Sequence, residues 1–296
     1  HEPHDMLSLL DIFAYSSNIG TAKLINNFDN LEYYELCKKF GFGIKTGLPF
    51  KSESSGKIRS VDSWSKTSKN YVSIGQEISV TSLQIALAYC AIANGGYLVK
   101  PHIIKDIKNK NNIIYKRNVQ PIRHTVKNST SNTILAAMEK VVSYGTAKDM
   151  GMAGYKIGGK TGTAQKFIHE SYSNTEFISS FVSIYPTSDP KYVIYISIDS
   201  PEYGYHWANE SAVPAVKEII KRIIIIDDVH IEKNILLTNN TIKNKDVNVN
   251  YTYNNTATTD NNKFVPNFKG KTLKQALRIA NRKGIILSPN SISGKI

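Results

Sequence analysis

One lysine of this chain stands in a stretch with almost no side-chain bulk. Residues 155–167 read YKIGGKTGTAQKF. Two glycines stand before Lys160, and it is followed by Thr161, Gly162 and Thr163. Small residues allow a second backbone to come close, and a lysine beside hydroxyls can bind a phosphate or a carboxylate. The stretch is therefore a candidate site for an anionic partner of either kind.

A phosphate-binding loop is the first interpretation. GYKIGGKT at 154–161 satisfies G-x-x-x-x-G-K-[ST], and YVIYISID, which ends at Asp199, could provide the accompanying magnesium-binding strand. Such a loop requires a buried strand before its first glycine and a helix directly after Lys-Thr. GTAKDMGMA before the motif is a poor strand and GTAQKFIHESYSN after it is a weak helix, so the nucleotide interpretation is disfavoured.

The second interpretation makes residues 155–166 an exposed strand at a sheet edge. An extended peptide could pair with its main chain while Lys160 and the threonine hydroxyls hold the carboxylate of that peptide. In serine acyl-transfer enzymes K-T-G works together with S-x-N and S-x-x-K. Each short motif recurs here: K-T-G also at 45–47, S-x-N at 16–18, 68–70 and 288–290, and S-x-x-K at 54–57 and 63–66.

Context distinguishes these copies. Residues 6–28 are predicted to form two helices broken at Ser16-Ser17-Asn18, a place where a side chain can be presented across a groove. Residues 41–75 are rich in Gly, Ser and Lys and are predicted to be a long surface excursion, which contains Lys45, Ser54 and Ser63.

The remaining elements predict the fold class. Thr81 and Gln84 form a capping box for a helix that ends at Gly95-Gly96, and a second helix is expected at 131–143. After residues 155–166 come two strand-rich runs joined by TSDP at 187–190, and a closing helix at 211–225. Helices followed by three consecutive strands and a helix indicate an α+β fold, an antiparallel sheet with helices packed on it.

Composition excludes little. The chain has 296 residues, a net charge of +13 and two cysteines. Lysine is spread along the whole chain, so the charge is interpreted as compositional bias and no nucleic-acid function is expected. Cys37 and Cys90 are expected to pack as small hydrophobic residues. HEPHD at 1–5 lacks a metal-site spacing, and no metal or cofactor is expected.

The ends suggest a fragment of a longer protein. The chain begins with His1 and has no signal-like segment. Its composition changes at 227, which predicts domain boundaries of 1–226 for the main domain, 227–262 for a disordered linker and 263–296 for the first part of a small second domain.

The motifs together resemble the class B penicillin-binding proteins, the membrane-anchored D,D-transpeptidases of bacterial cell-wall synthesis. The resemblance covers about residues 7–224. It rests on SSN and KTGTAQ and on four longer stretches, FGFGIKTGLPFKSESSGKI, VSIGQEISVTSLQIALAYCAIANGG, VVSYGTA and SSFVSIYPTSDPKYVIYISIDSP. FVPNFKGKTLKQALRIANRKGIIL at 264–287 is similar to the beginning of a PASTA domain, which favours a division-type or sporulation-type member.

This resemblance implies roles for particular residues. A serine nucleophile forms an acyl-enzyme from the D-Ala-D-Ala end of a stem peptide, and an amine of a second strand resolves it. Ser16 would relay a proton to the leaving amine, Asn18 would hold the substrate amide and the lysine that activates the nucleophile, and Lys160 would supply positive charge. Thr161, Gly162 and Thr163 would bind the substrate, and an N–H near Thr163 would serve the oxyanion hole.

One departure affects activity. The family order is S-x-x-K, S-x-N, K-T-G, and no S-x-x-K precedes Ser16. The chain is therefore expected to lack its nucleophile and to be inactive alone. The expected partners are stem peptides, β-lactams, other division and wall-synthesis proteins, and the membrane through a missing anchor, with the domain on the outer side of a bacterial membrane. A β-lactam sensor or β-lactamase, and a non-catalytic wall-binding scaffold, are the alternatives.

Overall fold

The computed structural model describes residues 6–109, 112–168 and 170–227. The predicted PASTA segment and linker residues 228–262 lie outside this range, as does HEPHD. Within the described part, no helix has the length and apolar character that a membrane span requires. The compact unit that holds the predicted site extends to Lys221.

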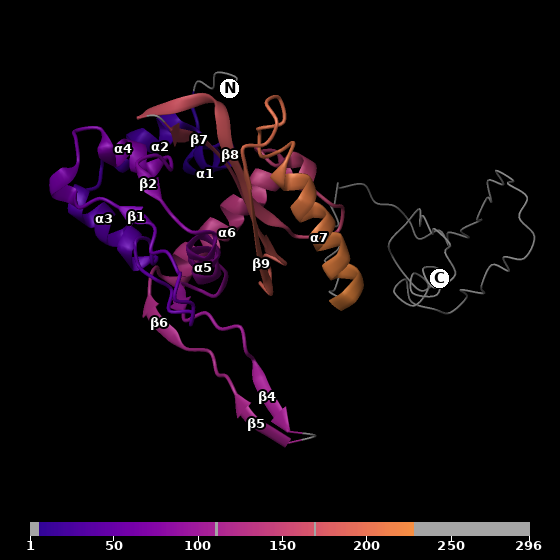
Figure 1. Cartoon of the computed structure of the whole chain (residues 1–296). Helices are drawn as coiled ribbons and strands as arrows, with labels where there is room; N and C mark the ends of the chain where they lie inside the picture. Colours follow the sequence, from indigo (N-terminus) through magenta and orange to yellow (C-terminus); the bar gives the residue numbers. More distant parts are fainter. Residues whose placement is uncertain (1–5, 110–111, 169, 228–296) are drawn as a thin grey trace, which may run out of the picture. The chain divides into compact units, whose positions relative to one another are not determined.

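A three-stranded antiparallel sheet forms the centre of this unit (Figure 1). Its strands are β7 (Gly158–Ile168), β8 (Ser171–Tyr185) and β9 (Tyr192–Asp199), in the order β7-β8-β9. Lys160 lies opposite Val182 in the β7–β8 register. The predicted antiparallel sheet with packed helices is confirmed. The strand pattern also excludes the phosphate loop, because β7 continues through Ile168 where that loop needs a helix.

Helices cover both faces of this sheet. Five successive residues of β8, from Phe181 to Tyr185, are buried, and because side chains alternate between faces, both faces must be covered. α5 (Ser82–Ala93) and α6 (Asn128–Ser143) pack against the strands, and Figure 1 shows the sheet passing between α6 and α7 (Ala212–Asp227). One cluster of the apolar core is formed by Ile92, Leu135, Met138 and Ile184.

The predicted helices form where their signals lie. α5 begins at the expected capping box, in which Gln84 N donates to Thr81 Oγ1 and Thr81 N donates to Gln84 Oε1. The residues around Ser16 form α1 (Leu9–Ala14) and α2 (Asn18–Ile25). α6 begins at Asn128, before the predicted start at 131, and Lys127 at its N-cap provides no side-chain cap that could have marked the start.

The excursion at 41–75 is held down by one buried side chain. Gln84 Nε2 donates to the carbonyl oxygens of Gly41, Ile44 and Ser55, at 3.3, 2.8 and 2.7 Å. The excursion contains β1 (Lys57–Ile58), a 3₁₀ turn (Val61–Ser63) and α4 (Ser68–Ser73), and β1 pairs with β2 (Ile78–Ser79). Its sequence lacks periodicity because its order depends on these long-range hydrogen bonds.

A further helix and a long hairpin were not predicted from the sequence pattern. α3 (Asn30–Lys39) begins at Asp29, whose carboxylate accepts from Leu31 N at 2.7 Å. A long hairpin leaves the unit between α5 and α6 (Figure 1). Its strands are β3 (Tyr97–Val99), β4 (Asp106–Asn109), β5 (Asn112–Lys116) and β6 (Pro121–His124), with β3 paired to β6 and β4 paired to β5.

Candidate active site

Ser16 occupies the junction between α1 and α2. Tyr15 caps the C-terminus of α1, and Ser16 follows it with φ +55°, a left-handed conformation in which helices usually place glycine. Ser17 then caps α2, since its Oγ accepts from Gly20 N at 3.1 Å. The first serine therefore follows the end of one helix and the second begins the next, so that Ser16 lies between the two helices in a strained backbone conformation.

Lys160 reaches this serine from β7. Its Nζ donates to Ser16 Oγ at 2.7 Å and to the Thr161 carbonyl at 3.0 Å, and it lies 5.8 Å from the centre of the Phe13 ring. Burial lowers the pKa of the Lys160 ammonium from 10.5 to about 8. A lysine with this pKa, bonded to a hydroxyl, can exchange a proton with it near neutral pH.

Thr146 joins the helical part to the strand. Its backbone N donates to the Ala14 carbonyl at 3.1 Å, and its Oγ1 is 2.7 Å from Thr161 Oγ1. Gly145 beside it must be glycine, because a Cβ there would lie 2.4 Å from the Ala14 oxygen. This role of Thr146 was not predicted from the stretch VVSYGTA. The residue fixes the distance between the element that carries Ser16 and the strand that carries Lys160.

A second contact anchors α1 to the same loop. Tyr144 OH donates to Asp11 at 2.6 Å, and the rings of Tyr144 and Tyr15 are 5.8 Å apart. Hydrogen bonds from Ser8 and Tyr144 lower the pKa of the Asp11 carboxyl, and the carboxylate raises the pKa of Tyr144 to about 12. This pair positions α1 without contacting Lys160.

The threonines of β7 are already engaged with the protein. Thr161 binds Thr146, and Thr163 Oγ1 accepts from Ala208 N at 3.4 Å. A hydroxyl has one donor and two acceptor sites, so the Thr163 O–H can still donate to a carboxylate. Gly162 lies between them, and its carbonyl accepts from Ser180 Oγ at 3.4 Å.

Asn18 is not part of the Ser16–Lys160 contact. It is the first residue of α2, is exposed, and forms no side-chain hydrogen bond with the described residues. It lines a cavity of about 290 Å³ between α2 and α4, together with Ile19, Tyr71 and Asn70. Asn70 belongs to the second S-x-N copy, whose Ser68 is buried and accepts from Ser65 N at 2.9 Å in a structural turn.

The glycines before Lys160 accommodate core side chains, whereas the sequence predicted that they admit a second backbone. A Cβ on Gly158 would lie 2.8 Å from Thr187 and 3.0 Å from Met138, and one on Gly159 would lie 2.3 Å from the Phe181 ring. β7 is half-buried and not the exposed strand predicted, because α6 and β8 fill this space. What remains open is its edge, since within the described chain only β8 pairs with β7, and an open edge can accept an extended peptide.

Comparisons with known proteins agree with this fold. Residues 1–221 match the family model described as the penicillin binding protein transpeptidase domain. The chain therefore belongs to the penicillin-binding protein transpeptidase family. The PASTA assignment lies beyond the residues that this match covers.

Two relatives indicate which penicillin-binding proteins the chain is similar to. The chain is 33% identical over 239 residues to a peptidoglycan D,D-transpeptidase FtsI homolog of Mesostigma viride, covering 74% of this chain and 40% of that protein. It is 31% identical to the stage V sporulation protein D of Bacillus subtilis, covering 74% of this chain and 34% of that protein. The resemblance to class B members is thus supported, and the chain spans less than half the length of these two relatives.

A solved structure shows the same architecture. Penicillin binding protein 3 of Mycobacterium tuberculosis, complexed with ampicillin, superposes with a TM-score of 0.70 at 30% identity, covering 76% of this chain and 52% of that chain. The ampicillin complex is a property of that protein.

Proposed function

We propose that this chain forms part of the active site of a peptidoglycan D,D-transpeptidase. The observation that carries the proposal is the hydrogen bond between Lys160 Nζ and Ser16 Oγ, which joins the helical part to an open sheet edge. The family match and the names of the relatives support the reaction class.

The proposed reaction is acyl transfer through a serine ester. A serine oxygen attacks the carbonyl carbon of the D-Ala-D-Ala bond, a C–O bond forms, and the C–N bond to the terminal D-Ala breaks. The proton from the attacking hydroxyl passes through Ser16 to the leaving amine. The amine of a second stem peptide then attacks the ester, forms the new amide and releases the serine.

The described residues take the remaining roles in proton transfer, substrate binding and oxyanion stabilisation. Lys160 favours proton transfer through Ser16 by its positive charge. Thr161 and Thr163 bind the substrate carboxylate beside Gly162, and the backbone N–H near Thr163 donates to the developing oxyanion, a type of contact worth about 3 kcal/mol. The family resemblance gives Asn18 the substrate amide and the lysine that activates the nucleophile, although in the described chain Asn18 is exposed and lines the cavity between α2 and α4.

We further propose that the nucleophile lies outside residues 1–296. Ser188, which begins the S-x-x-K at 188–191, is exposed in the turn between β8 and β9. The two S-x-x-K serines of the excursion serve their own turns: Ser54 Oγ accepts from Gly56 N at 3.1 Å, and Ser63 Oγ donates to the Ser60 carbonyl at 2.7 Å. Neither hydroxyl bonds to Ser16 or Lys160 in the described structure. The length of the relatives is compatible with a more N-terminal S-x-x-K.

The wider setting follows as part of the proposal. The substrate is the stem peptide of peptidoglycan on the outer side of a bacterial membrane, β-lactams acylate the same site, and the role is in septum or spore wall synthesis. The names of the FtsI homolog and of the sporulation protein support the role in wall synthesis.

Fluorescent penicillin tests the proposal. A version extended N-terminally to include an S-x-x-K should be labelled covalently, whereas residues 1–296 should not. In the extended version Lys160→Met should abolish labelling and Lys166→Met, on the same strand, should retain it. Labelling of residues 1–296 alone would show that a serine of this chain is the nucleophile, and labelling of the Lys160→Met protein at the normal rate would refute the role of Lys160.

A further inference from the structure

The hairpin between α5 and α6 is a projecting, charged and apolar structure that the proposed reaction does not use. We call residues 100–123 the arm. Its two strands stay paired beyond β3 and β6, with Lys100 N donating to the Gln120 carbonyl and Arg117 N to the Lys105 carbonyl, both at 2.8 Å. Figure 1 shows the arm extending away from the central sheet.

The arm exposes large apolar side chains. The exposed fractions are 68% for Ile103, 67% for Ile114 and 73% for Val119. Ile104, Ile107, Ile113 and Tyr115 are exposed as well. An isolated two-stranded hairpin is only marginally stable in water, and large apolar side chains gathered in the exposed part of one hairpin indicate an interaction site.

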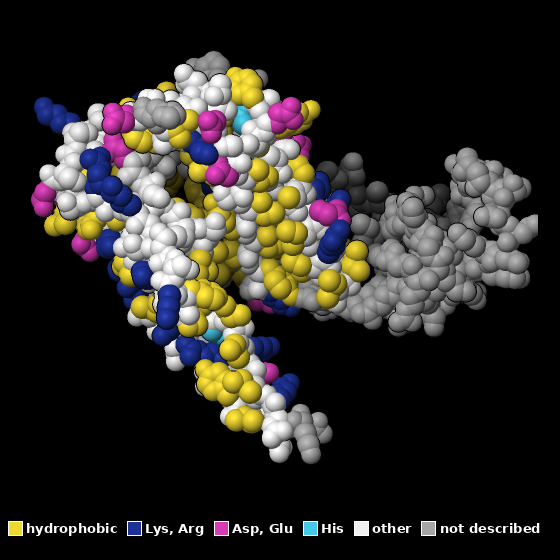
Figure 2. Space-filling model, in the orientation of Figure 1, with side chains coloured by type: hydrophobic (Ala, Val, Ile, Leu, Met, Phe, Trp, Pro, Cys, Tyr) yellow, Lys and Arg dark blue, Asp and Glu magenta, His cyan; other side chains and the backbone are white. Residues whose placement is uncertain are grey.

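The arm also carries a concentrated positive charge. Its sequence contains seven Lys or Arg residues against one acidic residue, Asp106, a net +6 of the +13 on the whole chain. Lys108 pairs with Asp106 at 3.9 Å. Figure 2 shows Lys and Arg side chains beside hydrophobic ones along the arm. The surplus is local and is not explained by an even spread of lysine.

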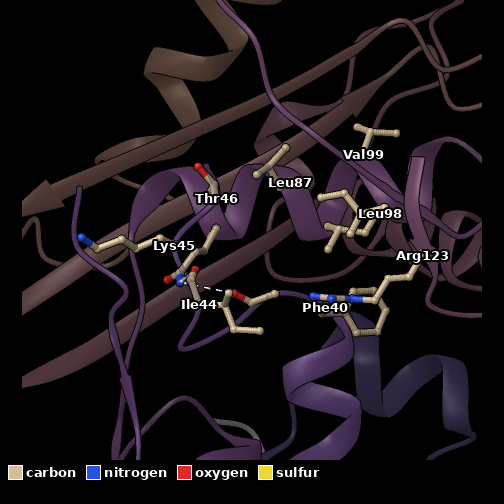
Figure 3. A pocket seen from close by; sticks show the side chains of 11 residues that line it. Phe40, Ile44, Lys45, Thr46, Leu87, Leu98, Val99 and Arg123 are labelled. Carbon is tan, nitrogen blue, oxygen red and sulfur yellow. Dashed lines mark hydrogen bonds between the residues drawn. The ribbon is translucent and has the colours of Figure 1, made fainter. Parts of the chain in front are cut away.

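A cavity of about 150 Å³ lies at the base of the arm (Figure 3). Phe40, Leu87 and Leu98 contribute apolar walls, and Lys45 and Arg123 lie on opposite sides of it in Figure 3. A cavity of this size holds one benzene-sized group, such as an aromatic side chain.

Arg123 is held in place at this cavity. Arg123 Nε and Nη2 donate to the carbonyls of Lys39 and Lys38 at 2.8 and 3.1 Å, contacts that orient the guanidinium without neutralising it. Glu53 binds Thr46 Oγ1 at 2.5 Å, so the second K-T-G copy already has an internal carboxylate. Arg123 is therefore the charge that an incoming acidic group would meet.

We infer that the arm and this cavity bind an extended acidic segment of another protein. Within the described chain, β4 and β5 pair only with each other, so each has an outer edge to which a strand can be added. Acidic side chains of the segment face the arm lysines, and one aromatic side chain enters the cavity. The inference is independent of the proposed transpeptidase activity.

Three other occupants fit less well. A second copy of the arm would bring net +6 against net +6, which is repulsive. A lipid bilayer would leave the outer backbone groups of both strands without hydrogen bonds in hydrocarbon. A polyanion without side chains would satisfy the charge but would leave the isoleucines and the cavity exposed.

Fluorescence anisotropy with synthetic peptides tests this inference on the full chain. The probe is a labelled peptide of alternating glutamate and valine with one central phenylalanine. It should bind, more weakly as NaCl is raised, whereas a peptide with lysine in place of glutamate should not. The double change Lys105→Glu/Lys116→Glu should weaken binding about tenfold or more, and the charge-matched control Lys66→Glu/Lys191→Glu, at exposed positions elsewhere, should not.

The cavity is tested by a paired comparison. Replacing the peptide phenylalanine by alanine should cost about tenfold in affinity. Ile122→Trp, a half-exposed residue at the cavity, should fill it and remove that difference, and an unchanged thermal unfolding curve shows that the variant folds. Hydrogen exchange should show new protection of arm amides in the complex.

Several results would overturn the inference. These are equal binding of the lysine peptide, no binding of the glutamate peptide, binding of vesicles of anionic lipid or of polyphosphate without binding of the peptide, and arm-dependent self-association in sedimentation.

Discussion

Lys160→Met tests whether the buried ammonium at the centre of the site lowers the free energy of unfolding. A fall of its pKa from 10.5 to about 8 corresponds to roughly 3 kcal/mol of destabilisation of the folded protein, because a tenfold change in proton affinity is worth about 1.4 kcal/mol. Methionine has similar length and no charge. The variant loses the hydrogen bonds to Ser16 and Thr161, each worth about 1 kcal/mol, so it should be about 1 kcal/mol more stable at pH 7.

The destabilisation by Lys160 should change with pH in a definite direction. Below pH 8 the lysine is protonated in both the folded and the unfolded chain, and the full cost is present. As the pH rises from about 8 toward 10.5, the folded protein releases the proton before the unfolded chain does, so stability increases. Urea unfolding, followed by tryptophan fluorescence at pH 7 and pH 10, should show this gain in the parent protein and its loss in Lys160→Met.

Lys166 on the same strand provides the matched control. Its Nζ donates to Asp199 at 2.8 Å, and this carboxylate raises the pKa of Lys166. The contribution of Lys166 is therefore present at neutral pH and lost as the pH rises above the ordinary lysine value, the opposite sign. The reasoning is refuted if Lys160→Met is clearly less stable than the parent at pH 7, or if Lys160→Met and Lys166→Met change the pH profile in the same direction.

Substitutions at three further positions test how the site is built. Ser16→Gly and Ser16→Ala both remove the hydroxyl, but only glycine relieves the left-handed backbone, so the glycine variant should be about 1 kcal/mol more stable in urea unfolding; equal stabilities would argue against strain. Gly159→Ala should destabilise by about 1 to 3 kcal/mol, because its Cβ meets the Phe181 ring at 2.3 Å, and a neutral result by calorimetry would contradict the packing. Thr146→Val should cost about 1 to 3 kcal/mol through the Thr161 hydroxyl left unpaired, and in a penicillin-labelled extended protein it should slow acylation, whereas Thr146→Ser should restore both; failure of the serine variant to do so would exclude a hydrogen-bonding role.

Much of the fold followed from local sequence. The capping box at Thr81, the helix break at Ser16-Ser17 and the turn at 187–190 all depend on interactions within a few residues, so the sequence pattern contains them. The arm and the excursion did not follow, because they are held by contacts such as those of Gln84, which spans up to 43 residues. The extended arm was missed since its isoleucines are exposed and therefore break the rule that predicts burial.

The candidate site, too, was predicted only in part from the sequence. The sequence by itself determined which groups were available: a lysine between small residues, a serine at a helix break, and threonines at alternate strand positions. Only the tertiary structure decided that Lys160 and Ser16 meet across 144 residues, that Asn18 faces a separate cavity, and that the glycines accommodate Met138 and Phe181. The physical reason is that hydrogen bonds and caps form between neighbours in the chain, whereas the lowered pKa of Lys160 requires the packing of α1, α6 and β7 around it.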